Sequence, residues 1–333
     1  MLCITRSNTK HTTHPLLLLG EGGRVMDKKK VIKYVIITYV IAWAFQIAGA
    51  VYELNNPGMN GHMIFQGSMA ICMFAPLAAA WIVRGNLKGI GWVPKIKGNV
   101  RWLLFAAYAM IPLTAVGGIL YYVIFPGMFD PSGSYMIAQN SQYGVDFEAK
   151  MAESGMTMQT YMIITFVSLI YIPFINVITA IGEEVGWRGF LYPELNKSMS
   201  RTKTWIVGGI IWAAFHFPAM LVGGYEYGKD YIGSPWFGLL VFTVVVIAYG
   251  ILEEIVYDKT KCIWYPALLH GSINAAVTMP QVFANADHQD ILTKYAVFGP
   301  IGTGLVISAP IIIFAVIMGA ISIRKQNNKE VSV

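Results

Sequence analysis

The sequence predicts an all-α, polytopic membrane protein: a bundle of about eight transmembrane helices with a polar cavity embedded in it. Only 13% of its 333 residues are charged and 56% are hydrophobic, whereas a soluble domain draws on about 25% charged residues to keep its surface in water. Long stretches contain no Asp, Glu, Lys or Arg. Clusters of Glu, Arg, His and Asn nevertheless occur within or beside these stretches, where such side chains are costly and therefore candidates for function.

The uncharged stretches are the predicted spans. One ionised side chain at the centre of a bilayer costs roughly 2.5–3.5 kcal/mol on insertion scales, and a helix needs about 20 residues to cross about 30 Å of hydrocarbon. Eight stretches meet or nearly meet that length: 34–52, 54–83, 102–129, 154–182, 204–225, 231–252, 262–286 and 295–323. No period of self-similarity relates them, so the inverted repeats of many transporters are not predicted.

The distribution of Lys and Arg predicts the orientation, because cytoplasmic loops retain positive charge. With the N-terminus inside, the inner segments hold 18 of these residues and the outer loops hold three. Both termini are therefore expected in the cytoplasm. The net charge of +6 follows from this topology and from contact with anionic lipid. The lipid bilayer is thus a predicted partner, and no basic segment interleaved with aromatic residues suggests a nucleic acid.

Two segments lie outside the predicted spans. The apolar run within residues 1–25 is too short for a signal peptide, and we expect a non-native or disordered leader there, with translation starting at Met26. A single integral membrane domain then comprises residues 26–333. The outer loop 126–158 contains several Gly and Pro residues, and its sequence is compatible both with a folded cap and with a disordered loop.

The first polar cluster is the segment Glu183–Gly189 (EEVGWRG), at the inner end of the fourth predicted span. On a helix Glu184 and Arg188 are neighbours at i and i+4 and can pair. Glu183 lies about 100° around the helix and is free to face elsewhere. Taken alone, this cluster also fits an ordinary charged helix end at the membrane interface.

Two histidines mark other spans. His216 lies in the fifth span, 13 residues after Lys203 and 10 before Glu226, which places it roughly 15–20 Å from either charged residue along a helix. His270 lies in the seventh span, and Asn274 follows at i+4 on the same helix face. Taken alone, His216 also fits a hydrogen bond to a neighbouring helix carbonyl. The pair of His270 and Asn274 likewise fits a polar clamp between helices.

Together these groups predict a hydrolytic site. Polar groups buried at similar depth must satisfy one another or line water, and all of them can lie in the cytoplasmic half of the bundle. A set of Glu, His, His and Asn supplies a general base, a proton shuttle and donors to an oxyanion. The same set could equally hold a zinc ion with open coordination positions.

These clusters resemble the motifs of the CPBP family of intramembrane peptidases, which includes the type II CAAX prenyl endopeptidases and the bacterial Abi and bacteriocin-processing proteins. That family carries EExxxR, FxxxH and HxxxN on successive membrane helices. Here Glu183-Glu184-x3-Arg188 matches the first motif, and His270-x3-Asn274 matches the third. Three motifs in this order, in separate spans, are a specific signal that none of them provides alone.

The second motif departs from the family pattern. Trp212 stands where Phe is usual, four residues before His216. An aromatic residue is retained, and Trp-x3-His-x-Pro resembles a common bacterial variant. The resemblance covers a family core of about 160–283, and a bacterial cell membrane is the expected location.

The resemblance implies an intramembrane endopeptidase that hydrolyses a peptide bond of a peptide or membrane-protein substrate. Glu183, helped by His216, would deprotonate a water molecule that attacks the peptide carbonyl. His270 and Asn274 would stabilise the oxyanion. Residues implied in structural support are Glu184, Arg188 and Trp212.

The resemblance leaves the use of a metal open. A metal-dependent enzyme of this kind would use Glu183, His216 and His270 as zinc ligands. No third strong ligand at the spacing of a zinc site is evident in the sequence. We therefore favour a glutamic mechanism without metal or cofactor.

Two other functions and one further acidic pair complete the predictions. A non-proteolytic relative could act as an immunity or scaffold protein, and a proton-coupled transporter could use the same Glu and His residues as a relay. Glu253 and Glu254 lack an Arg four residues on and precede several charged residues, so we expect a solvated loop face there. The substrate is open among leader peptides, pheromone precursors and membrane-protein tails, and nothing in the sequence requires that it be prenylated.

Overall fold

The computed structural model describes residues 25–331, which form an all-helical bundle with no β-strand among them. Within this range one isolated antiparallel bridge joins Phe129 to Ala284. The predicted all-α class is confirmed. The predicted leader lies outside the described residues, except for its last residue.

The helices follow one another in three groups. The first group comprises α1 (Lys28–Asn55), α2 (Met59–Cys72), α3 (Ala75–Arg84), α4 (Val100–Tyr108) and α5 (Met110–Ile124). The middle group comprises η1 (Pro126–Met128), α6 (Ser134–Gln142), α7 (Phe147–Glu153), α8 (Met158–Ser168), α9 (Ile172–Gly186), η2 (Trp187–Leu191) and α10 (Tyr192–Asn196). The last group comprises α11 (Arg201–Phe215), η3 (Ala219–Gly223), α12 (Trp236–Thr260), α13 (Trp264–Ala276), η4 (Met279–Phe283), η5 (Ala286–His288), α14 (Gln289–Lys294), η6 (Ala296–Phe298) and α15 (Leu305–Val331).

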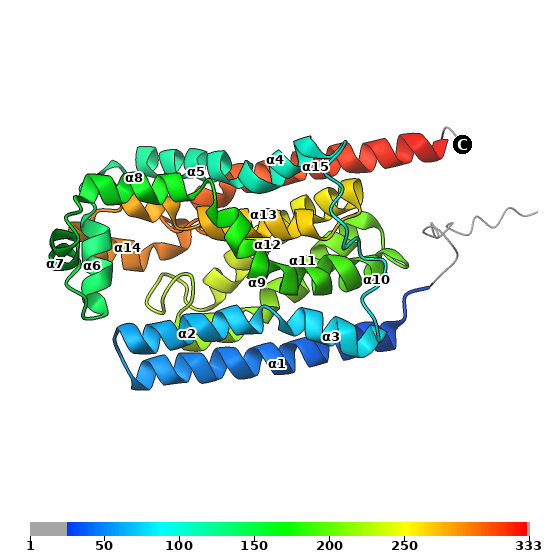
Figure 1. The fold of residues 1–333 in the computed structure, drawn as a ribbon, viewed down its shortest axis with the longest axis horizontal. Coiled ribbons are helices and arrows are strands. Elements are labelled where there is room, and N and C mark those ends of the chain that lie inside the picture. The colour runs from blue at the N-terminus through cyan, green and yellow to red at the C-terminus, as the bar shows by residue number, and fades with distance from the viewer. Residues whose placement is uncertain (1–24, 332–333) are drawn as a thin grey trace, which may run out of the picture.

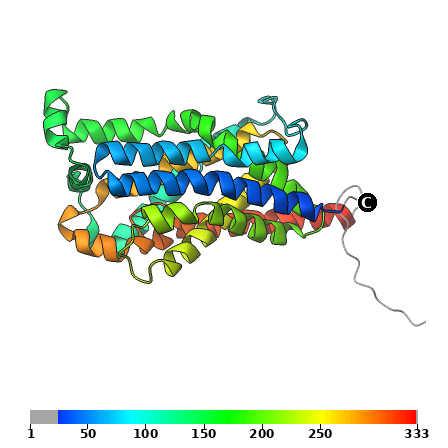
Figure 2. The ribbon, with the colours of Figure 1, turned by 90° about the horizontal axis from the view of Figure 1, so that it is seen from below.

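The long helices lie side by side, with their axes close to the long axis of the molecule. Figures 1 and 2 show α1, α2 and α3 as one layer along one side of the bundle. In Figure 1, α1 begins and α15 ends at the same end of the bundle. The two ends of the described chain therefore lie at the same end of the bundle.

The outer surface of α1 shows what solvent the bundle is built for. Ile32, Ile36 and Val40, each one helical turn apart, are more than half exposed, whereas Thr38 and Gln46 are fully buried. A soluble protein would place its polar residues outside and its apolar residues inside. The reversed arrangement is the one that lipid requires, because apolar side chains contact the hydrocarbon and polar ones bond within the protein.

The loop 126–158, which the sequence predicts to be an outer loop, is folded as a helical cap. It contains η1, α6 and α7, and the N-terminus of α7 is capped by Asp146, whose carboxylate accepts a hydrogen bond from the backbone N–H of Ala149 at 2.9 Å. Figure 1 shows α6, α7 and α14 together at one end of the bundle. This decides between the two alternatives that the sequence left open for the loop.

Prolines set the length of the helices around the site. A proline lacks the N–H that bonds to the carbonyl four residues earlier, and its ring clashes with that carbonyl. The α-helix breaks or widens just before each of four prolines: Pro173 after α8, Pro193 after the π-helical segment η2, Pro218 after α11 and Pro280 after α13. The helices that carry the polar motifs are consequently shorter than those that surround them.

Five helical segments are long and apolar enough to cross a membrane, and a sixth is added if α8 and the helix that follows it, bent by 54°, count as one span. These helices make the protein an integral membrane protein. The predicted span 204–225 overlaps α11, which begins at Arg201 and has 15 residues, and the predicted span 262–286 contains α13, which has 13 residues. At 1.5 Å per residue these helices are only about 20 Å long. The predicted count of eight spans is compatible with this arrangement and stays a prediction.

The helix α12 passes through the middle of the bundle. Of its most apolar 18 residues 78% are buried, compared with 33% for α1. It also continues to Thr260, eight residues beyond the end of the predicted span 231–252. Side chains at its end are therefore held inside the protein, which matters for the site below.

Candidate active site

Two consecutive glutamates near the end of α9 point into different parts of the bundle, because successive helix residues are about 100° apart. Glu183 is 1% exposed. Its Oε2 accepts hydrogen bonds from the indole Nε1 atoms of Trp187 at 3.0 Å and Trp212 at 2.6 Å. No group among the described residues donates to its Oε1. One oxygen of Glu183 is thus held in place, and the other is available to a further donor.

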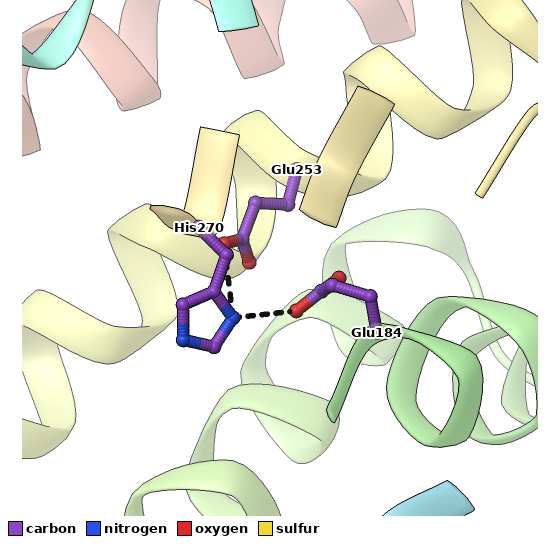
Figure 3. Close-up of side chains that lie close together, drawn as sticks. All are labelled: Glu184, Glu253 and His270. Atoms are coloured by element: carbon purple, nitrogen blue, oxygen red, sulfur yellow. Dashed lines mark hydrogen bonds and ion pairs between the residues drawn. The ribbon is translucent and has the colours of Figure 1, made fainter. Parts of the chain in front are cut away.

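Glu184 faces a second cluster. Its Oε1 accepts hydrogen bonds from the guanidinium of Arg188 and from Nδ1 of His270, both at 2.9 Å. The i, i+4 pair of Glu184 and Arg188 that the sequence predicts is confirmed. Because the carboxylate accepts, Nδ1 of His270 carries the hydrogen, and Nε2 is left for other contacts. Figure 3 shows Nε2 on the side of the ring away from the carboxylates.

Glu253 completes this cluster, and the prediction of a solvated loop face there is wrong. Glu253 is fully buried, its Oε2 forms an ion pair with Arg188, and its Oε1 lies 3.9 Å from Nδ1 of His270. Figure 3 shows Glu253, Glu184 and His270 converging from three helices. The sequence fits both a loop position and a buried position for Glu253, because this residue directly follows an uncharged stretch. In the structure α12 continues past Glu253 to Thr260, and this continuation keeps the side chain inside the bundle.

Arg188 lies at the centre of these contacts. It is fully buried, and its guanidinium lies over the rings of Trp212 at 4.4 Å and Tyr192 at 4.9 Å. A buried cation is stable only where carboxylates and aromatic faces replace its water. Arg188 has both, and it connects the cluster around Glu184 to the ring that donates to Glu183.

Glu254 belongs to a separate network. It is 7% exposed, and its Oε2 accepts hydrogen bonds from Arg201 at 2.7 Å and from the indole of Trp205 at 2.9 Å. Arg201 also donates to Ser322 on α15 at 2.8 Å. This network joins α11, α12 and α15, so the prediction of a solvated face is wrong for Glu254 as well.

His216 follows the last residue of α11, and it is connected to the site through Trp212. Its Nδ1 lies 3.2 Å from the backbone carbonyl of Trp212. A carbonyl only accepts, so Nδ1 donates and Nε2 carries the free lone pair. The imidazole packs edge-on against Phe215 and Phe242. Aromatic packing and this hydrogen bond fix the orientation of the ring.

Asn274 lies apart from the cluster around Glu184. It is exposed and lines a cavity of about 280 Å³ between α8, α9 and α13. Asn176 lines the same cavity and donates a hydrogen bond to the backbone carbonyl of Gly271 at 3.1 Å. No hydrogen bond joins Asn274 to His270 among the described residues. The sequence placed both on one face of α13, but only His270 reaches the charged cluster.

The residues that could converge on a metal differ from those that the sequence predicted. Ligand atoms of Glu184, Glu253 and His270 lie within 4.8 Å of one another. The guanidinium of Arg188 already pairs with both of these carboxylates, and a divalent cation between them would be repelled by it. The donor set therefore does not fit zinc, and no other group of three or more ligands is found among residues 25–331.

Two comparisons with known proteins match part of this chain. Residues 165–276 match the model of the family described as type II CAAX prenyl endopeptidase Rce1-like. We call this segment, which is similar to that family, the CAAX protease-like core. Over 102 residues the chain is 31% identical to CAAX prenyl protease 2 from Methanococcus maripaludis, a match that covers 30% of this chain and 37% of that relative.

The CAAX protease-like core extends from the end of α8 to the end of α13, close to the predicted limits of 160–283. It contains all three motifs and also Glu253, which belongs to none of them. The core therefore includes the whole of the charged cluster. The chain spans about a third of the length of the curated relative that it matches, so its own activity is argued below from its residues.

Proposed function

We propose that this chain is an intramembrane endopeptidase that hydrolyses a peptide bond of a peptide or membrane-protein substrate. The observation that carries this proposal is Glu183, a carboxylate buried within the CAAX protease-like core. Two indole N–H groups hold one of its oxygens, and the other is available to a water molecule. A buried carboxylate with one free oxygen, linked through Trp212 to a fixed imidazole, is suited to general base catalysis.

In the proposed mechanism Glu183, helped by His216, removes a proton from a water molecule. The resulting hydroxide forms a bond to the carbonyl carbon of the substrate, whose π electrons move onto the oxygen. When the tetrahedral intermediate collapses, the C–N bond breaks and the leaving amine takes the proton from Glu183. Nε2 of His216 can accept a hydrogen bond from the same water, because its Nδ1–H is directed at the carbonyl of Trp212.

His270 and Asn274 are the proposed donors to the oxyanion. Glu184 and Glu253 face Nδ1 of His270, and this arrangement favours the protonated, doubly donating form of the ring through their negative charge. The amide of Asn274 lines the adjacent cavity, where a substrate backbone can bond to it. Fixed donors of this kind stabilise developing negative charge, because they need no reorganisation during the reaction.

The proposed mechanism uses no metal, since Arg188 supplies the positive charge in the cluster of Glu184, Glu253 and His270, the one group with ligand spacing among residues 25–331. Metal analysis of active, purified protein tests this point. We expect activity without a stoichiometric metal ion. A stoichiometric zinc ion whose removal abolishes cleavage would contradict it.

The experiment that tests the function compares the membrane peptidomes of cells that express wild type, Glu183→Gln or Glu194→Gln. Glu194 of α10 is the matched control, because its ion pair with Lys197, the residue after that helix, lies outside the three motifs. We expect a set of fragments to appear with wild type and Glu194→Gln and to be absent with Glu183→Gln. Full proteolysis by purified Glu183→Gln would refute the assignment of the base.

The proposed setting is the bacterial cell membrane, with both termini in the cytoplasm. The two ends of the described chain lie at one end of the bundle (Figure 1), which supports a common side for them. Fusions of a periplasm-specific reporter to the C-terminus and to the loop 126–158 test the orientation. We expect activity from the loop fusion only.

A further inference from the structure

Trp212 contacts three different functional groups of the site. Its indole N–H donates to Oε2 of Glu183 at 2.6 Å, its ring face lies 4.4 Å from the guanidinium of Arg188, and its backbone carbonyl accepts from His216. The side chain is 3% exposed. The phenylalanine that is usual at this position of the family motif has an aromatic face but no N–H, so the contact with Glu183 is specific to a chain with tryptophan here.

The contact with Arg188 affects the contact with Glu183. A cation over the face of an indole is attracted to its π electrons, and hydrogen bonds polarise one another in a low-dielectric interior. The charge of Arg188 therefore makes the N–H of Trp212 a stronger donor to a carboxylate. Glu184 and Glu253 hold Arg188 in this position, because one pairs with each terminal nitrogen of the guanidinium.

We propose that Trp212, together with Trp187, is a positioning residue of the general base: its indole N–H, polarised by Arg188, holds Oε2 of Glu183 so that Oε1 faces the reacting water. Glu253 acts one step further away, because it anchors the guanidinium over the ring. This role rests on the proposed function of Glu183. It connects the two clusters of the site, which share no direct hydrogen bond among the described residues, through the side chain of Trp212.

The chain offers a matched control seven residues earlier on α11. Trp205 donates its indole N–H to the buried carboxylate of Glu254 at 2.9 Å, and Arg201 lies over its ring at 5.3 Å. The chemistry is the same, but none of its three members belongs to the motifs of the core. A role of Trp212 in packing alone predicts that Trp205→Phe and Trp212→Phe behave alike.

The first arm of the test is spectroscopic and needs no substrate. The protein is labelled with ¹⁵N-tryptophan in lipid nanodiscs, where its nine tryptophans give indole N–H resonances, and the Phe variants assign those of Trp212 and Trp205. We expect Glu183→Gln and Glu253→Gln to shift the Trp212 resonance and to leave that of Trp205 in place. A Trp212 resonance that does not move in either variant would overturn the proposal.

The second arm is kinetic. An internally quenched peptide library identifies a cleaved peptide, and kcat and KM are measured for wild type, Trp212→Phe and Trp205→Phe after the folded fraction of each has been determined. A misplaced catalytic group can cost about 100-fold in rate, and we expect kcat of Trp212→Phe to fall about 10- to 100-fold with little change in KM. Trp205→Phe should keep the kcat of wild type. Equal kcat values for the two variants would overturn the proposal.

The two arms separate this inference from the proposed function. If wild type cleaves no peptide of the library and Glu183→Gln changes no peptidome, the proposed function fails. The resonances still decide whether Trp212 holds Glu183 and whether Glu253 acts on that contact. If wild type cleaves, only the positioning role fails when the Trp212 resonance does not respond to Glu183→Gln and Glu253→Gln, or when kcat does not respond to Trp212→Phe.

Discussion

Replacing Arg188 by Met should destabilise the folded protein strongly, because it removes the guanidinium that pairs with Glu184 and Glu253. All three side chains are fully buried. Losing one partner of a buried ion pair costs about 3–5 kcal/mol, and desolvated cation–π contacts such as those with Trp212 and Tyr192 contribute up to about 2 kcal/mol each. Because such contributions are not fully additive, we expect a loss of about 4–6 kcal/mol in the free energy of unfolding.

The assay is equilibrium unfolding in mixed micelles, followed by far-ultraviolet circular dichroism, with Arg201→Met as the control. Arg201 also pairs with a carboxylate and lies over a tryptophan, but its side chain is 13% exposed, so solvent screens the charges that are left behind. We expect that variant to lose less than about 2 kcal/mol.

A double variant tests the cause. Adding Glu253→Gln to Arg188→Met removes one of the two stranded carboxylates and should restore at least about 1 kcal/mol, because a buried unpaired charge costs more than a buried amide. Two outcomes would refute the reasoning. Equal losses in the two Met variants would show that burial of the pair is unimportant, and a double variant no more stable than Arg188→Met would show that the stranded charge is not the cause.

Two further predictions concern other parts of the fold. Burial raises the pKa of Glu226 to about 7, although hydrogen bonds from Thr303 and Tyr225 act to lower it. A carboxyl whose pKa is raised on folding stabilises the folded protein at low pH, and this stabilisation is lost as the pH rises through the pKa of the folded state. Unfolding measured from about pH 5 to about pH 8 should show falling stability in wild type and a flatter profile in Glu226→Gln, and equal slopes would contradict this. Gly186→Ala places a Cβ 2.3 Å from Pro76 and should lower the free energy of unfolding by about 1–3 kcal/mol through overpacking. The control variant Gly67→Ala places its Cβ where no atom lies within 4 Å and should not destabilise the protein. Equal melting temperatures of the two variants would contradict this prediction.

Much of the site could be predicted from local chemistry. The spacing of Glu184 and Arg188 on one helix is enough to bring them together, because side chains at i and i+4 are neighbours on any α-helix. The separation of Glu183 from that pair follows from the same geometry. The resemblance to the family motifs also indicated which three segments of the chain carry the site, and all three lie within the CAAX protease-like core.

Contacts between helices could not be predicted in the same way. Glu253 carries no local signal, and its inclusion in the cluster depends on where α12 ends and on which helix faces it. Asn274 follows His270 at the spacing that puts both on one helix face, yet the neighbours of α13 place one in a cavity and the other against Glu184. The helical period determines in which direction a side chain points from its own helix axis. It does not determine which residues of other helices that side chain meets.

The sequence by itself determined that this protein is helical and lies in a membrane, because the lack of charge over long stretches is a property of the chain that no folding can change. It also determined which residue types are costly there. Only the tertiary structure decided how these costs are met: Arg188 of η2 is shared between carboxylates of α9 and α12, and Trp212 of α11 links it to Glu183. The physical reason is that a buried charge is stabilised only by groups within a few ångströms, and in this bundle most of those groups come from other helices.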